Sequence, residues 1–118
     1  MYGRSMDYKL FLDDERNPEY LTESGCWELE DVKDFIVCRS TEEAKAYVQA
    51  NGMPEYMALD HDLGGMDTTM IFLHWLAESY WDGQSPIPVY GVHSSNPCGT
   101  KNIIAYMESW RKSCKLSR

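Results

Sequence analysis

Three short stretches of this sequence carry the residues that could do chemistry. The stretch ALDHDLGG places Asp60, His61 and Asp62 side by side before two glycines. LFLDDER, residues 10–16, contains a pair of aspartates, and VHSSNPCGT, residues 92–100, contains a histidine followed by two hydroxyls and an amide. Carboxylates bind hard divalent cations, and imidazoles exchange protons near neutral pH. These residue types favour a site that holds a metal ion and a phosphate group.

Each of the three stretches begins in an apolar run that is typical of a buried β-strand. A fourth run, DFIVCRS, has the same character. Strands are therefore predicted at about residues 8–14, 34–40, 55–60 and 87–92.

Helices are predicted between and after these strands. Residues 40–52 begin with a capping box of Ser40 and Glu43 and end at Gly52, with Ala44, Tyr47 and Val48 on the apolar face. Residues 66–83 carry apolar side chains at spacings of three and four, with Asp67 as the expected N-cap. Residues 99–114 form the last predicted helix, with Ile103, Met107 and Trp110 on one face. Asn96 and Pro97, before this helix, are expected to form a turn. Residues 17–33 show no clean hydrophobic period.

Strands that alternate with helices predict an α/β fold, with a mostly parallel sheet of about four strands in one domain over residues 1–118. In such folds ligands bind at the carboxyl ends of the strands, where the polar stretches lie. If the first and third strands are neighbours, Asp13 or Asp14 would lie close to Asp60. Carboxylates that close need a cation or a shared proton, so Mg²⁺ or Mn²⁺ is the expected cofactor, with Asp13, Asp14, Asp60 and Asp62 as its candidate ligands.

The composition limits the classes of partner. The chain has 11 Lys and Arg against 19 Asp and Glu, a formal net charge of −8, which argues against non-specific binding to duplex nucleic acid. The basic residues near the C-terminus are interpreted as a solvated helix face or as contacts to a small phosphate ligand: Lys101, Arg111, Lys112 and Lys115.

The same composition predicts a cytoplasmic protein, in the host cytoplasm if the source is viral. The four cysteines form no C-x-x-C pair, which favours reduced thiols over a zinc or redox motif. No signal peptide is recognisable, and no stretch approaches the roughly 20 apolar residues of a membrane span.

The motifs resemble a known family. LFLDDER and ALDHDLGG look like the acidic pair and central aspartate of response-regulator receiver domains. The full set, LDDERNP, RSTEEA, LDHDLGG and VHSSNPCGTKNI, more closely resembles the cyclic-phosphate-processing receiver domains, over about residues 8–110. The resemblance implies a receiver-like (flavodoxin-like) three-layer sandwich that acts on cyclic phosphate ends, in RNA repair or in conflicts between phages and hosts.

The resemblance also implies roles for individual residues. Asp13 and Asp14 match the metal-binding acidic pair, Asp60 matches the phospho-accepting aspartate, and His93 and Ser94 fall where a receiver carries its switch hydroxyl. A receiver has a fifth strand with an invariant lysine, which this sequence lacks. Ordinary phosphotransfer signalling is therefore the least favoured of three functions.

The favoured function is a metal-assisted phosphoesterase that opens cyclic phosphates on RNA ends or small cyclic nucleotides. Imidazoles suit the two proton transfers of that reaction, so His61, His93 and Asp60 are the predicted catalytic residues. The alternatives for the two histidines are structural roles. The predicted substrate-binding residues are Ser94, Ser95, Asn96, Arg16 and Lys101. The remaining alternative is a module that binds a phosphorylated or cyclic nucleotide, or a protein partner, without turnover.

Overall fold

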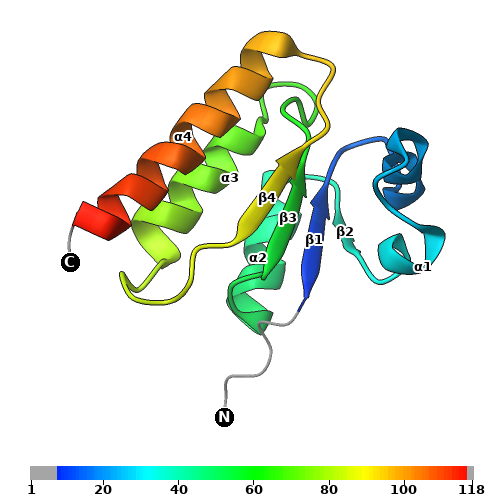
Figure 1. The fold of residues 1–118 in the computed structure, drawn as a ribbon. Helices are drawn as coiled ribbons and strands as arrows, with labels where there is room; N and C mark the ends of the chain where they lie inside the picture. Colours follow the sequence, from blue (N-terminus) through cyan, green and yellow to red (C-terminus); the bar gives the residue numbers. More distant parts are fainter. Residues whose placement is uncertain (1–7, 117–118) are drawn as a thin grey trace.

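The computed structural model describes residues 8–116 and contains a four-stranded, wholly parallel sheet. The strand order is β2-β1-β3-β4, so β1 and β3 are neighbours at the centre (Figure 1). The strands are β1 (Lys9–Leu12), β2 (Ile36–Cys38), β3 (Tyr56–Leu59) and β4 (Val89–Val92). The predicted α/β receiver-like fold is confirmed. The strands are shorter than the predicted runs: β1, β2 and β3 end before the polar residues at the carboxyl ends of their runs, and β4 begins after Pro88.

Helices connect and follow the strands. They are η2 (Pro18–Ser24, a 3₁₀ helix), α1 (Leu29–Val32), α2 (Thr41–Asn51), α3 (Thr69–Trp75), η3 (Leu76–Tyr80, a π-helical turn) and α4 (Pro97–Leu116). α3 and α4 lie side by side on one face of the sheet, and η2 and α1 lie at the β1 and β2 side of the molecule (Figure 1). No helix in residues 8–116 is long and apolar enough to cross a membrane.

The two faces of the sheet are covered unequally. On one face, Leu10, Leu12, Met57 and Leu59 belong to a large apolar core that includes buried residues of α2, α3 and α4. On the other face, Phe11 and Ala58 pack in a small cluster with Val32, Phe35 and Trp27, from α1 and its flanks. The alternation of side chains along each strand produces this division. The third layer of the sandwich therefore consists of the short segment from η2 to α1.

The predicted start and end of α2 are confirmed. The Ser40 hydroxyl accepts a hydrogen bond from the Glu43 backbone N–H at 3.2 Å, and Gly52 ends the helix with φ 92°. The Glu43 carboxylate accepts from the backbone N–H of Arg39, one residue before the capping position. The apolar face is also as predicted, since Ala44 and Val48 are fully buried.

The predicted N-cap of the next helix is wrong. α3 begins after Thr68, not after Asp67, because residues 62 and 68 form a β-bridge that delays the helix. The Asp67 carboxylate instead accepts a hydrogen bond of 2.8 Å from the Thr41 N–H, at the start of α2. Asp67 therefore caps the neighbouring helix. The helix widens into a π turn at its end, where the Trp81 N–H bonds to the Leu76 carbonyl.

The last helix begins earlier than predicted. The expected turn at Asn96 and Pro97 is instead the start of α4: Pro97 is its first residue, and the Asn96 side chain accepts a hydrogen bond from the Gly99 N–H at 3.0 Å. Proline fits the first helical position because that residue has no intrahelical partner for an N–H. The predicted apolar face is confirmed, since Ile103 and Met107 are fully buried and Trp110 is 5% exposed.

Candidate functional site

The site is built from the first residue after each of three neighbouring strands. Asp13, Asp60 and His93 follow β1, β3 and β4 directly. Their backbone N–H groups extend the ladder by one step, to the carbonyls of residues 38, 12 and 59, at 3.1, 3.0 and 2.9 Å. The three residues therefore form one row across the sheet, and the pleat turns their side chains toward the face of Phe11 and Ala58.

A cluster of three carboxylates lies at this row. Asp13, Asp14 and Asp60 each offer one oxygen, and these oxygens lie within 4.8 Å of one another. Asp13 is 1% exposed, and its Oδ1 is held by the backbone N–H groups of Glu15 and Arg16, both at 2.8 Å. A fixed set of oxygen donors is what a hard divalent cation requires. The expectation that the central strands would bring these acids together is confirmed, and the donor set fits Mg²⁺ or Mn²⁺.

The charge at the cluster is incompletely balanced. Burial raises the pKa of Asp60, and the negative charge of Asp13 raises it further. Hydrogen bonds from the His61 backbone N–H and the Ser94 hydroxyl lower the pKa of Asp60 and oppose these two effects. Because the net direction is upward, a cation at the cluster would stabilise the ionised form of Asp60.

His93 is held by the cluster and by the sheet. Its Nε2 lies 2.9 Å from Asp13 Oδ2, and its ring stacks on Phe11 with centroids 4.8 Å apart and planes 6° apart. The side chain is 7% exposed, and burial lowers the pKa of His93 against the opposing effect of Asp13. We therefore assign a neutral ring whose Nε2–H donates to Asp13. The other ring nitrogen, Nδ1, is buried and has no hydrogen-bond partner among the described residues.

Two arginines surround the acidic loop after β1. Arg16 donates from Nη1 to the His93 carbonyl at 3.1 Å, lies 3.8 Å from Asp13 Oδ2 and stacks over the Tyr20 ring at 4.5 Å. Arg39 donates to the backbone carbonyls of Asp13 and Arg16. Arg16 was predicted as a site residue, whereas Arg39 was not. The sequence feature that could have identified Arg39 is its place in the RSTEEA motif, directly after β2 and beside the acidic loop.

A comparison with protein families agrees with this geometry. A model of the cyclic-phosphate processing receiver domain matches residues 8–109, which include the whole acidic cluster, both arginines and His93. The chain belongs to this family. Neither the curated proteins nor the solved structures contain a significant match to it. The predicted resemblance is thus confirmed over nearly the same residues.

In this receiver domain the second histidine lies apart from the first. The His61 ring packs on α4: a Cβ added to Gly99 would come within 2.4 Å of His61 Cγ. His61 Nδ1 pairs with Asp62 Oδ1 at 3.1 Å. The Asp60 backbone still continues the ladder, so Asp60 and His61 turn to opposite sides of the sheet edge, Asp60 to the acidic cluster and His61 to α4. The structure therefore does not bring His61 together with His93.

Asp62 and Asn96 join the loop after β3 to the start of α4. Asp62 is not a member of the acidic cluster, and its Oδ2 accepts a hydrogen bond of 3.1 Å from Asn96 Nδ2. The Asn96 Oδ1 accepts from the Gly99 N–H, so both ends of the amide have a partner within the receiver domain. Both residues thus link the loop to α4, and their metal and substrate contacts stay predictions.

The other predicted contacts differ in their distance from the cluster. The Ser94 hydroxyl lies near Asp60, and its hydrogen bond is one of the effects that lower the pKa of Asp60. Ser95 is exposed on the loop, and Lys101 is exposed on α4. Gly64 and Gly65 have the predicted turning role, with φ of 96° and 57°, and Gly64 lets the chain pass close to Asp14.

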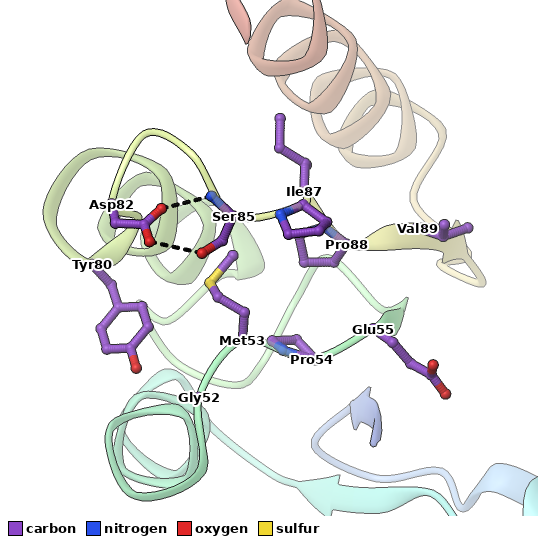
Figure 2. A pocket seen from close by; sticks show the side chains of 11 residues that line it. Gly52, Met53, Pro54, Glu55, Tyr80, Asp82, Ser85, Ile87, Pro88 and Val89 are labelled. Atoms are coloured by element: carbon purple, nitrogen blue, oxygen red, sulfur yellow. Dashed lines mark hydrogen bonds between the residues drawn. The ribbon is translucent and has the colours of Figure 1, made fainter. Parts of the chain in front are cut away.

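A cavity of about 650 Å³ lies at the opposite end of the sheet (Figure 2). Met53 and Pro54, from the turn after α2, face Ile87 and Pro88, from the segment that enters β4 (Figure 2). Asp82 closes one side through hydrogen bonds to Ser85. This cavity is at the amino ends of the strands and shares no residue with the acidic cluster.

Proposed function

We propose that this receiver domain is a metal-assisted phosphoesterase that opens cyclic phosphates on RNA ends or on small cyclic nucleotides. The observation that carries the proposal is the cluster of Asp13, Asp14 and Asp60 with the guanidinium of Arg16 beside it. Carboxylates alone repel a phosphate, whereas a cation on the carboxylates and a neighbouring arginine attract it from two sides. The family to which the chain belongs supports the same substrate class.

Each part of the cluster has a role in this proposal. The three carboxylates would hold Mg²⁺ or Mn²⁺, which supplies charge neutralisation for the phosphate and a lower pKa for the attacking water. Arg16 would bind a phosphate oxygen that points away from the carboxylates. His93 acts as a positioning residue, because its N–H donates to the Asp13 carboxylate and its ring stacks on Phe11.

The reaction is a hydrolysis. Water adds to the phosphorus, one bond from phosphorus to the 2′ or 3′ oxygen breaks, and the proton lost by the water is balanced by the proton gained by that oxygen. The predicted pair of imidazoles does not fit this step, since His61 packs on α4. Of the three predicted catalytic residues, Asp60 and His93 lie at the cluster, and Asp60 keeps the catalytic role because His93 positions Asp13.

The test is turnover of an RNA that ends in a 2′,3′-cyclic phosphate, together with a panel of small cyclic nucleotides. We expect a monophosphate product with Mg²⁺ or Mn²⁺ and none with a chelator. Asp60→Asn should abolish turnover, whereas Asp62→Asn, which removes an exposed carboxylate outside the cluster, should leave most of it. Turnover that survives both the chelator and Asp60→Asn would refute the proposal.

The role of His93 has its own comparison. Glutamine offers an amide N–H that can donate to Asp13, and alanine does not. His93→Gln should therefore keep more activity and more metal affinity than His93→Ala. Equal losses in both variants would contradict a positioning role.

One observation favours the second candidate, a module that binds its ligand without turnover. The Nε2 of His93 is occupied by Asp13 and its Nδ1 is buried, so the imidazole at the cluster presents no nitrogen to a substrate. Retention of the cyclic phosphate without any product, with the metal present, would support this function over hydrolysis. Labelling of Asp60 by a small phosphodonor would instead support phosphotransfer signalling.

A further inference from the structure

A second cavity, of about 500 Å³, lies on the thinly covered face of the sheet. Its floor is made by Ala58 of β3 and Gly91 of β4, and Tyr20, Trp27 and Tyr56 contribute aromatic walls. In one row across this face, the residues become smaller from β1 to β4. Phe11 on β1 is in register with Ala58 on β3, and Ala58 is in register with Gly91 on β4, where the Tyr56 hydroxyl lies over the glycine.

The cavity adjoins the acidic cluster through His93. His93 lines the cavity, and the same ring reaches Asp13 through Nε2 at 2.9 Å. Tyr20, on the wall, carries the stacked guanidinium of Arg16, which in turn lies 3.8 Å from Asp13. A ligand with a phosphate at the cluster and Arg16 would therefore have its next few atoms at the mouth of the cavity.

The lining indicates what chemistry would enter. No lysine or arginine is among the described residues that line the cavity, and Glu23 adds a negative charge, so a phosphate is disfavoured inside it. Aromatic rings at the edge of a cavity are suited to stacking a base. The Glu23 carboxylate can accept hydrogen bonds from base edges, and the Ser24 hydroxyl can donate or accept them. The volume is in the range of small-ligand pockets.

We propose that this cavity binds the nucleobase of the nucleotide whose phosphate lies at the acidic cluster. The part of the inference that concerns the phosphate rests on the proposed function. The base would stack among Tyr20, Trp27 and Tyr56, with the ribose beside His93. The domain would thus select nucleotides over other cyclic phosphates without reading a duplex.

The first experiment uses free nucleosides, which carry no phosphate. Adenosine, guanosine, cytidine and uridine are titrated into the full chain, and the amide signals of Ala58 and Gly91 and the indole N–H of Trp27 are followed by NMR. We expect at least one nucleoside to shift all three signals. Absence of shifts for all four nucleosides would overturn the inference.

Two pairs of variants locate the binding. Cys26→Trp places a large ring at the exposed rim of the cavity, and Glu19→Trp places the same ring on the exposed surface of η2, outside the lining. Cys26→Trp should weaken nucleoside binding about tenfold, as expected for the loss of a base stack, and Glu19→Trp should not. Tyr20→Ala should weaken binding, and Tyr20→Phe, which keeps the ring, should not. Wild-type affinity in both Cys26→Trp and Tyr20→Ala would also overturn the inference.

The second experiment separates this inference from the proposed function. The opening of a nucleoside 2′,3′-cyclic phosphate is compared with that of methyl riboside 2′,3′-cyclic phosphate, which has no base. We expect kcat/KM for the base-free compound to be lower by about tenfold, and Cys26→Trp to remove the difference. Equal kcat/KM values would refute the base cavity and leave the phosphoesterase intact. Nucleoside binding without turnover of either compound would refute the phosphoesterase and leave the base cavity intact.

Discussion

At the scale of single residues, Asp60 is a carboxylate whose surroundings disfavour its ionised form. Both burial and the nearby Asp13 raise its pKa. A buried negative charge beside another one lowers the stability of the fold whenever no cation balances it. Removal of the Asp60 charge should therefore stabilise the protein.

Asp60→Asn should therefore raise the stability of the metal-free protein by about 1 kcal/mol. The sign follows from the raised pKa: the folded state disfavours the charged form, so this carboxylate lowers stability as pH rises above its ordinary titration range. Millimolar Mg²⁺ should raise the melting temperature of the wild type and leave that of Asp60→Asn unchanged. Asp62→Asn is the matched control and should keep the Mg²⁺ response. A response that is lost in Asp62→Asn and kept in Asp60→Asn would contradict the assignment of the cluster.

Cys38 gives a second prediction at this scale. Burial, and then the charge of Glu43, raises the pKa of the Cys38 thiol to about 11, whereas Cys26 and Cys98 are exposed. At pH 8 a thiol with that pKa has about 100-fold less thiolate than one with its ordinary value. Iodoacetamide should label Cys26 and Cys98 first and Cys38 only after unfolding, as read by mass spectrometry. Because the folded state favours the neutral thiol, stability should also fall as pH rises from 9 toward 11. Labelling of Cys38 at the rate of Cys26 in the native protein would contradict this.

At the scale of elements, the pairing of β3 with β4 depends on a small residue. A Cβ added to Gly91 would come within 2.2 Å of the Tyr56 hydroxyl oxygen but only within 3.4 Å of its ring carbon Cζ. Tyrosine and glycine at these two positions are therefore complementary in size. Both residues also line the second cavity.

Gly91→Ala should destabilise the protein by about 1–3 kcal/mol, because the added methyl overpacks the sheet face. Adding Tyr56→Phe should recover most of that loss, since the clash is with the hydroxyl alone. The measurement is denaturant unfolding of the wild type, the two single variants and the double variant. If the losses of unfolding free energy in the two single variants simply added up in the double variant, the expected clash between the new methyl group and the Tyr56 hydroxyl would be contradicted.

At the scale of the whole molecule, the net charge leads us to predict that this domain does not bind nucleic acid non-specifically along its backbone. The net charge is −8, and the exposed basic residues Lys101, Arg111 and Lys112 lie along α4, away from the acidic cluster. Lys115 was predicted as part of the same basic group, and its side chain lies outside the described residues. Nucleotide recognition in this molecule would be confined to one strand-end site and the neighbouring cavity.

The protein should accordingly show no salt-dependent binding to duplex DNA or duplex RNA. A mobility-shift assay at low ionic strength is the most demanding condition, because electrostatic binding is strongest there. A single-stranded RNA with a cyclic phosphate end serves as the positive comparison. Duplex binding that weakens steeply with added salt would contradict the prediction and point to the α4 face.

The local patterns of the sequence were sufficient to predict much of this molecule. The apolar runs predicted all four strands, and the Ser40 cap and Gly52 stop predicted α2. The place of Asp13 and Asp60 after two strands predicted that they would meet if the strands were neighbours. These features follow from chain-local chemistry: side-chain alternation, capping and turn residues act within a few positions.

The tertiary structure alone decided the contacts that depend on neighbours distant in the chain. Asp67 caps α2, because the bridge between residues 62 and 68 moves the start of α3. His61 and His93 lie on different sides of the sheet edge, and the second cavity is lined by Ala58 and Gly91, which are in register on neighbouring strands. The sequence by itself determined which residues stand at the strand ends. Strand order and packing between elements, which no local period encodes, decided which of them face one another.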